Sequence, residues 1–274
     1  MTGISALLLG DSSDPILQCI AQVAMSLSIR TTSRSIPTNF SLAITESGFE
    51  VETTDCATWI FNRLSLAPVL QTMRDKGDRS YASTEWTAAL AAWSAANRGR
   101  QYNAPLTYNQ LGAGATPLNL SMILRSSDVQ TPHWRCVSAA KDIRRISSSD
   151  QPFYSVDSND RLCRLNMHPQ PIADGSALIG AASTCGLHSI YFIDDHLLHL
   201  SDEGKEMPVT SGQRKLTAFI RLRLSMGWGL LHFDPGSNTI WSIAPHVPDS
   251  NLPYYLPFLT NAISEIFSGN HSNE

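Results

Sequence analysis

Residues 227–250, GWGLLHFDPGSNTIWSIAPHVPDS, decide how the second half of this 274-residue chain folds. Two apolar runs, GLLHF and TIWSI, flank the sequence DPGSN. Asp, Pro, Gly, Ser and Asn set or tolerate the dihedral angles of tight turns, so the stretch predicts two strands joined by a turn. Hairpins of this kind carry metal-binding carboxylates in several enzyme classes. This one has His232, Ser242 and Ala244 where acidic ligands would be sought.

The sequence around this hairpin predicts further strands and helices. QRKLTAFIRLRLSMGW (213–228) is typical of an amphipathic helix that leads into the hairpin, and LPYYLPFLTNAISEIFSG (252–269) of a C-terminal helix. HSIYFIDDHLLHL (188–200) predicts two strands around a tight turn at the Asp pair. QTPHWRC (130–136) predicts a strand that begins at its proline.

The N-terminal sequence predicts strand, helix and strand in succession. ISALLLG (4–10) is a strand, ILQCIAQVAMSLSI (16–29) a helix with Asp14 as N-cap and Pro15 at its first position, and RTTSRSIP (30–37) the next strand. Residues 42–64 predict a hairpin and one more strand. This order indicates an α/β fold with a parallel, Rossmann-like sheet.

The middle of the chain contains the expected domain boundary. STEWTAALAAWSAANRG (83–99) predicts a helix that is capped by Ser83 or Thr84 and stopped by Gly99. The Gly-, Pro- and Asn-rich residues 100–117 that follow are typical of a loop. We therefore expect one domain over residues 1–110 and a second over residues 111–274.

Composition excludes several classes of protein. A hydrophobic content of 42% is typical of a globular chain, and a net charge of −4 argues against non-specific nucleic-acid binding. The five cysteines form no Cys-x-x-Cys pair, which argues against a zinc cluster. The apolar run at residues 4–10 is too short to cross a membrane and lacks a basic flank. We expect a cytoplasmic protein with no nucleic-acid or membrane partner.

No set of residues on its own predicts catalysis. LGAGATP (111–117) has glycines but no following lysine, so it indicates a linker rather than a phosphate loop. His188, His196 and His199 lie near one hairpin, where polar edge residues are the alternative to a metal site. Serines are plentiful, but no Gly-x-Ser-x-Gly sequence is present.

The ordered pieces SALLLGDSSDP, SRSIPTNFSLAI, TWIFNRLSLAPV and STEWTAALAAWSAANRGRQYNAP resemble the N-terminal part of ATP-grasp peptide maturases of the microviridin type. LNLSMILRSSDVQTPHWRCVS continues that resemblance, and HSIYFIDDHLLHL and RLSMGWGLLHFDPGSNTIWSIAP resemble the second half of the family. The resemblance implies a Rossmann-like pre-ATP-grasp domain followed by an ATP-grasp-like α+β domain. It also implies a homodimer.

The departures from the family pattern concern the nucleotide site. The family has an Asp on the first strand of the last hairpin and Glu-x-Asn on the second, and these positions fall on His232, Ser242 and Ala244. Magnesium prefers oxygen ligands, ideally anionic ones, so these residues predict a degenerate metal site. No lysine lies between Lys141 and Lys205, where the family places phosphate-binding lysines. We therefore expect a second domain that lacks much of the nucleotide-binding subdomain, with no bound cofactor.

From these departures we expect a non-catalytic, truncated ATP-grasp homologue, similar to accessory peptide-binding proteins of pathways such as that of crocagin. It would hold the leader of a ribosomally made precursor peptide for a separate modifying enzyme. Residues 190–200 are the expected peptide-binding surface, with Tyr191, Phe192, His196 and Leu198, although the apolar side chains could simply be core. Two alternatives stay open: an active ATP-dependent carboxylate–amine or ester ligase with rearranged metal ligands, and a structural partner of a catalytic homologue.

Overall fold

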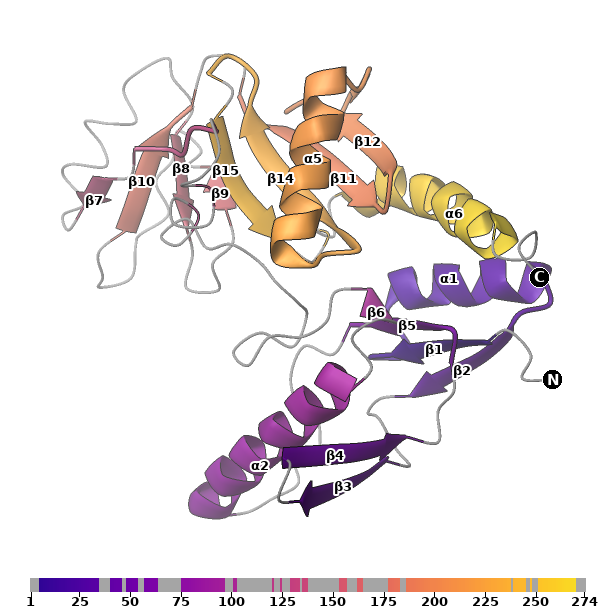
Figure 1. The fold of residues 1–274 in the computed structure, drawn as a ribbon. Helices are drawn as coiled ribbons and strands as arrows, with labels where there is room; N and C mark the ends of the chain where they lie inside the picture. Colours follow the sequence, from indigo (N-terminus) through magenta and orange to yellow (C-terminus); the bar gives the residue numbers. More distant parts are fainter. Residues whose placement is uncertain are drawn as a thin grey trace. The chain divides into compact units, whose positions relative to one another are not determined.

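The chain forms two compact units in a computed structural model (Figure 1). Unit 1 contains Met1–Ala113, Phe219–Trp228 and Pro245–Glu274, and unit 2 contains Gly114–Ala218 and Gly229–Ala244. The expected boundary after residue 110 stays a prediction. The structure describes residues 5–34, 40–45, 48–53, 57–63, 75–96, 101–102, 120, 124, 129–133, 135–137, 153–156, 162–164, 177–182, 186–237, 239–244, 247 and 251–269.

Unit 1 is built on a four-stranded parallel sheet with the strand order β2-β1-β5-β6. Its strands are β1 (Ser5–Leu9), β2 (Arg30–Arg34), β5 (Trp59–Asn62) and β6 (Gln101–Tyr102). Helix α1 (Pro15–Ser26) connects β1 to β2. The predicted succession of strand, helix and parallel strand is confirmed, as is the mixed α/β class.

The start of α1 is fixed by its predicted N-cap. One carboxylate oxygen of Asp14 accepts hydrogen bonds from the backbone N–H groups of Ile16, at 2.8 Å, and Leu17, at 3.4 Å. The other oxygen lies 2.8 Å from Nε of Arg63. Pro15 occupies the first turn, where its missing N–H costs no hydrogen bond. Asp14 thus satisfies free donors at the helix start and joins it to the residue after β5.

The β3–β4 hairpin and helix α2 follow the sequence prediction with one correction. Strands β3 (Phe40–Thr45) and β4 (Gly48–Thr53) pair antiparallel, as expected. Helix α2 (Lys76–Ala96) begins earlier than the predicted cap at Ser83 or Thr84. Asp75 accepts hydrogen bonds from the N–H groups of Gly77 and Asp78, at 2.6 and 3.2 Å, so it is the residue that caps the helix.

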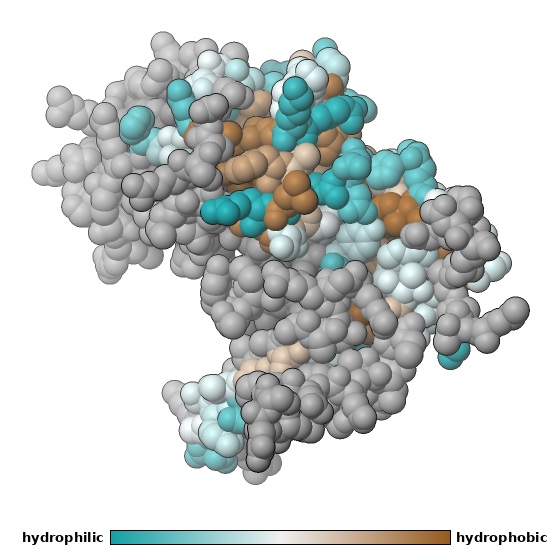
Figure 2. Space-filling view, in the orientation of Figure 1, coloured by the Kyte–Doolittle hydropathy of each residue, from teal (hydrophilic) through white to brown (hydrophobic). Residues whose placement is uncertain are grey.

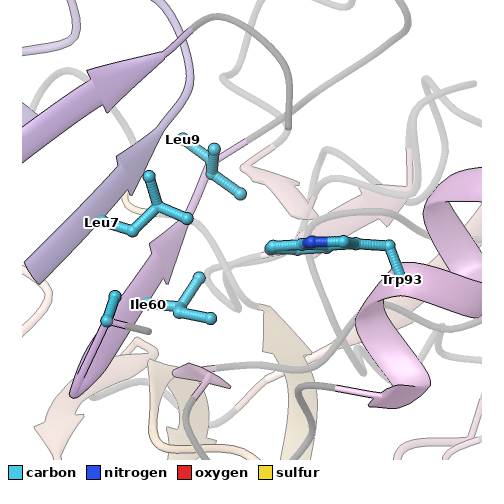
Figure 3. Packing of buried hydrophobic residues seen from close by; sticks show 5 residues of the cluster. Leu7, Leu9, Ile60 and Trp93 are labelled. Atoms are coloured by element: carbon cyan, nitrogen blue, oxygen red, sulfur yellow. The ribbon is translucent and has the colours of Figure 1, made fainter. Parts of the chain in front are cut away.

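Trp93 of α2 packs against the parallel sheet. It is buried with Leu7, Leu9 and Ile60, and Figure 3 shows its indole ring facing the side chains from β1 and β5. Leu7 and Leu9 alternate with Ala6 and Leu8, which are also buried, so both faces of β1 are covered. This burial explains the continuous apolar run of the strand.

Helix α6 (Leu252–Gly269) is the predicted C-terminal helix, and it lies against α1. The Cys19 sulfur lies 3.2 Å from the Thr260 hydroxyl, and the rings of Trp59 and Phe267 have centroids 4.6 Å apart. The segment that closes the chain therefore completes the core of unit 1. None of the described helices combines the length and apolarity that crossing a membrane requires.

Unit 2 contains two sheets, an antiparallel one with strand order β7-β10-β8-β9 and a second with order β13-β12-β11-β14-β15, in which both hairpins pair antiparallel. The first consists of β7 (Arg135–Val137), β8 (Phe153–Val156), β9 (Leu162–Arg164) and β10 (Ala177–Ala181). The second consists of β11 (His188–Ile193), β12 (His196–Leu200), β13 (Glu206–Met207), β14 (Trp228–Asp234) and β15 (Thr239–Ala244).

The strands and helix predicted in the last third of the chain are confirmed. β11 and β12 form a hairpin around Asp194, whose positive φ of 47° suits a tight turn. Helix α5 (Ser211–Leu224) precedes the β14–β15 hairpin. The glycine-containing loop at residues 111–117 and most of the helix expected after residue 118 lie outside the described residues.

Candidate functional site

The β14–β15 hairpin brings His232, Ser242 and Ala244 to one face of the sheet. His232 pairs with Ser242, and Leu230 pairs with Ala244, in the antiparallel register. Side chains that are paired or two residues apart on a strand share a face. The register then shifts between His232 and Phe233, which marks a β-bulge. The three positions singled out in the sequence are therefore neighbours in space.

Ser189 of β11 extends this group across a third strand. Its hydroxyl oxygen lies 3.1 Å from Nδ1 of His232, and its residue is only 8% exposed. The sheet order places β14 between β11 and β15. Ser189, His232 and Ser242 consequently form a polar row over three adjacent strands, which we call the hydroxyl–imidazole row.

Ser242 differs from the other members of the row in its hydrogen bonding. It is 6% exposed, and its hydroxyl makes no side-chain hydrogen bond in the described part of the chain. Ser242 is therefore an almost fully buried residue of the row, directly opposite the half-buried His232.

The sequence resemblance assigns metal ligands to the positions of His232, Ser242 and Ala244, and these three residues do not fit magnesium. A hydroxyl, an imidazole and a methyl group offer no anionic oxygen, which this hard cation prefers. Asp234 is the acidic residue of the hairpin, and its carboxylate accepts a hydrogen bond from the N–H of Gly236 at 2.9 Å, within the turn. Within the described ranges, no three His, Cys, Asp or Glu side chains are grouped to hold a metal.

The opposite face of the same sheet carries a pair of histidines, His188 and His199. Nδ1 of His188 lies 2.9 Å from Nε2 of His199, whose own Nδ1 lies 3.2 Å from the Pro208 carbonyl oxygen. Since a carbonyl oxygen only accepts, His199 donates from Nδ1 and accepts at Nε2 from His188. The two rings pack on Phe233, with centroid distances of 5.7 Å for His188 and 5.4 Å for His199.

Burial lowers the pKa of His188 below its ordinary value of 6.5. The imidazole would lose hydration on becoming charged, and the positive charge of His199 lowers the pKa further. The carboxylates of Asp202 and Asp234 act in the opposite direction. The lowered pKa favours the neutral form of His188.

The residues expected to bind a peptide lie mostly inside the protein. Tyr191 and Phe192 are 0% exposed and Leu198 is buried, which favours the core alternative for these three side chains. His196 is half-buried next to the exposed Asp195 at the hairpin turn. Peptide binding at this hairpin stays a prediction.

Apolar side chains with high exposure occur elsewhere. Leu222 of α5 is 84% exposed, between the half-buried Arg221 and the exposed Arg223. Figure 2 shows hydrophobic atoms bordered by hydrophilic ones over the place that α5 occupies in Figure 1. Such a mixed surface is common on interaction faces and on ordinary exposed helices alike.

Sequence reasoning missed Ser189. This serine stands 43 positions before His232 in the chain and has no motif around it. Its position in a strand of almost entirely apolar residues could have identified it. A serine in such a strand is expected to be buried and to need a hydrogen-bond partner.

Comparisons with known proteins identify the fold. No family model matches the chain, and no curated protein matches its sequence. Among solved structures, macrocyclase MdnC from Microcystis aeruginosa MRC, bound with precursor peptide MdnA, has a TM-score of 0.63 and 11% identity, over 97% of this chain and 100% of the other. ATP-grasp ligase PsnB, complexed with minimal precursor, Mg and ADP, has a TM-score of 0.59 and 13% identity, with coverage of 94% and 98%.

A third match is a RiPP-associated ATP-grasp ligase of Chryseobacterium gregarium, in complex with ADP and a leader and core peptide. It has a TM-score of 0.61 and 7% identity, and the alignment covers 97% of each chain. At such identities the likeness establishes the fold alone. It extends over nearly the whole length of each protein.

These matches overturn the expectation that the chain is not an enzyme. The three proteins named above, which share its fold from end to end, are two ATP-grasp ligases solved with ADP and a macrocyclase. The expectation was wrong because it took three residues of one hairpin and an interval without lysine as decisive for a whole nucleotide site. The resemblance seen in the sequence is confirmed at the level of structure, and the chain shares the fold of these ATP-grasp ligases.

Proposed function

We propose that this chain is an ATP-dependent ligase that binds a ribosomally made precursor peptide and joins a carboxylate to an amine or hydroxyl. One observation supports this most strongly: 94–97% of the chain aligns with 97–100% of two ATP-grasp ligases and a macrocyclase, and the structures of all three contain precursor or leader peptides. Because the likeness covers both units, it supports a function in which both units take part.

The chemistry of such a ligase is a condensation that ATP drives. The carboxylate takes the terminal phosphoryl group and releases ADP, and the amine or hydroxyl then displaces phosphate to form the amide or ester. Because magnesium does not fit His232, Ser242 and Ala244, the proposal assigns no step to a metal at this hairpin. This proposal corresponds to the alternative of an active ATP-dependent ligase with rearranged metal ligands.

The proposal includes a peptide-binding surface at the β11–β12 hairpin. The β11–β12 hairpin offers His196 and Asp195 at its accessible turn, while the buried Tyr191 and Phe192 would hold the hairpin in shape. A homodimer and a separate modifying enzyme remain predictions of the resemblance, and size-exclusion chromatography with light scattering tests the first directly.

A reconstitution experiment tests the proposal. The purified full chain is incubated with ATP, Mg²⁺ and the peptides encoded by short reading frames next to its gene, and ADP release and peptide mass are followed. We expect ADP formation that depends on the peptide and a product lighter by one water for each bond. A scrambled peptide of the same composition is the control.

The outcomes separate binding from catalysis. Peptide-dependent ADP release with a dehydrated product supports the ligase. Tight peptide binding, measured by fluorescence anisotropy, without ADP release or a mass change would contradict the ligase and retain only peptide binding. Equal binding of the scrambled control would contradict both parts.

A further inference from the structure

Helix α5 carries positive charge and no negative charge of its own. Residues Ser211–Leu224 include four of the chain's 20 lysines and arginines and no aspartate or glutamate, although the whole chain has a net charge of −4. No ion pair of Arg214 or Lys215 is seen among the described residues. The charge of these two side chains is therefore not neutralised by the described part of the chain.

The stability of the helix does not explain Arg214 and Lys215. Both stand near the start of α5, whose first turn contains no acidic residue. The start of a helix has partial positive charge, so cations are less favourable there than at the other end, which the two arginines of the last turn complement. The start is already held by reciprocal hydrogen bonds between Thr210 and Gln213. The two cations near it therefore add no stability to the helix.

Leu222 lies on the same side of α5 as these cations. Residues four apart in a helix lie one turn along the same face, so Arg214, Ala218 and Leu222 form one row, with Lys215 beside it. Arg214, Lys215 and Ala218 are exposed, and Leu222 is 84% exposed. Figure 2 shows hydrophobic atoms among hydrophilic ones where α5 lies. We call these four residues the α5 outer face, which has positive charge at one end and an apolar side chain at the other.

We propose that the α5 outer face binds an acidic segment of the precursor peptide, with carboxylates on Arg214 and Lys215 and an apolar side chain over Leu222. The choice of a peptide rests on the proposed function, in which the substrate supplies a carboxylate. Opposite charges attract, and covering an exposed leucine removes apolar surface from water. The helical rise puts Leu222 about 10–12 Å along the helix from the two cations. The matching carboxylates and apolar side chain of an extended peptide are therefore about three residues apart.

A peptide fits this face better than a membrane or a nucleic acid does. A helix that lies on a membrane has a broad apolar face, whereas Leu222 is the one large apolar side chain among the exposed residues of α5. Non-specific nucleic-acid binding draws on a basic surface, and the net charge of the chain is −4. One leucine beside two cations matches a short acidic segment with an apolar residue.

Fluorescence anisotropy on the full chain tests this inference. The probe is a labelled synthetic peptide of three Glu-Glu-Ser-Leu repeats, which offers carboxylates and leucines at the required spacing. Two comparison peptides have glutamine in place of each glutamate, or serine in place of each leucine. We expect each comparison peptide to bind at least about fivefold more weakly than the probe, and added salt to weaken binding of the probe.

Matched variants locate the binding. Arg214→Glu reverses one charge of the outer face, and Arg30→Glu makes the same change in net charge at an exposed residue of β2. We expect at least about fivefold weaker binding of the probe for the first and a change of less than about twofold for the second. Leu222→Ser should weaken binding about three- to tenfold, whereas Met25→Ser, at a 73% exposed residue of α1, should not weaken it.

The variants should keep their fold, because each replaces an exposed side chain. A glutamate at position 214 also suits the start of a helix, so Arg214→Glu should lose affinity without losing stability. The same variant should gain affinity for a peptide of Lys-Lys-Ser-Leu repeats, which a structural effect alone would not produce. Circular dichroism confirms the fold of each variant.

Three results would overturn the inference. The first is equal binding of the glutamate and glutamine peptides, and the second is equal affinity of Arg214→Glu and Arg30→Glu for the probe. The third is binding to vesicles of phosphatidylglycerol and phosphatidylcholine that Leu222→Ser abolishes, without binding of the probe, which would assign α5 to a membrane surface. Failure of the proposed function is a different result, since it appears as absence of peptide-dependent ADP release whatever the affinity for the probe.

Discussion

The polar side chains on the two faces of the β13-β12-β11-β14-β15 sheet differ in their hydrogen bonding. On one face, His188 donates to His199, which donates to the Pro208 carbonyl, so the chain of hydrogen bonds ends on the backbone. On the other face, Ser189 and His232 are bonded, but the hydroxyl of Ser242 makes no side-chain bond within the described residues. The first network is closed by the fold, and the second joins side chains of adjacent strands.

This difference bears on the stability of the sheet. A closed network packed on Phe233 stabilises the sheet and resists change, because each donor already has its acceptor. Ser242, on the second face, makes no side-chain hydrogen bond seen among the described residues. Substitutions in the first network should therefore reduce stability more than a substitution of Ser242 does.

Phe233→Ala should have the largest effect on stability. Phe233 is buried against both rings of the closed network, and its truncation leaves a cavity that costs about 3–5 kcal/mol of unfolding free energy. Urea unfolding followed by tryptophan fluorescence measures the loss. Phe233→Leu fills most of the space and should lose clearly less. Equal losses for the two variants would contradict the packing argument.

His199→Ala should come next. It removes the buried central ring of the closed network, with its hydrogen bonds to the half-buried His188 and to the exposed Pro208, which costs about 1–3 kcal/mol. The same unfolding assay applies. His133→Ala is the control, because His133 is an exposed histidine of unit 2. A loss as small as that of the control would show that the hydrogen bonds contribute little.

Local sequence chemistry explains which parts of the fold were predictable. Asp14 and Pro15 mark the start of α1, and turn residues mark the two hairpins, so these elements follow from a few neighbouring residues. The start of α2 was missed because Asp75, its cap, precedes a stretch with a glycine and few apolar residues. The described residues of this first turn are exposed, and the local hydrogen bonds to Asp75 fix where the helix begins.

The candidate site was predictable only where it lies within one hairpin. His232, Ser242 and Ala244 were found because β14 and β15 are adjacent in the sequence, whereas Ser189 comes from a distant strand. Tyr191 and Phe192 stand in a run of apolar residues, a pattern typical of a strand buried on both faces. That pattern favours core over a peptide-binding surface.

The closed face should also make stability depend on pH. The pKa of His188 is lowered in the folded chain, while the unfolded chain keeps a value near 6.5. The unfolded state therefore binds more protons as the pH falls below about 6.5, and stability should be full above that pH and decrease below it. His188→Gln should reduce this dependence. Melting temperatures measured from pH 8 to about pH 5 test the sign, and a rise in stability on acidification would contradict it.

Ser242→Ala should have the smallest effect on stability and the most informative one. The Ser242 side chain takes part in no hydrogen bond seen among the described residues, so the substitution breaks no such bond. We expect the free energy of unfolding to change by no more than about 0.5 kcal/mol, or to rise slightly, in the same urea assay. Ser189→Ala is the comparison, because it breaks the bond to His232 and should cost about 1 kcal/mol. If Ser242→Ala lost as much as Ser189→Ala, its hydroxyl would be part of the fold, and the two faces of the sheet would not differ in this respect.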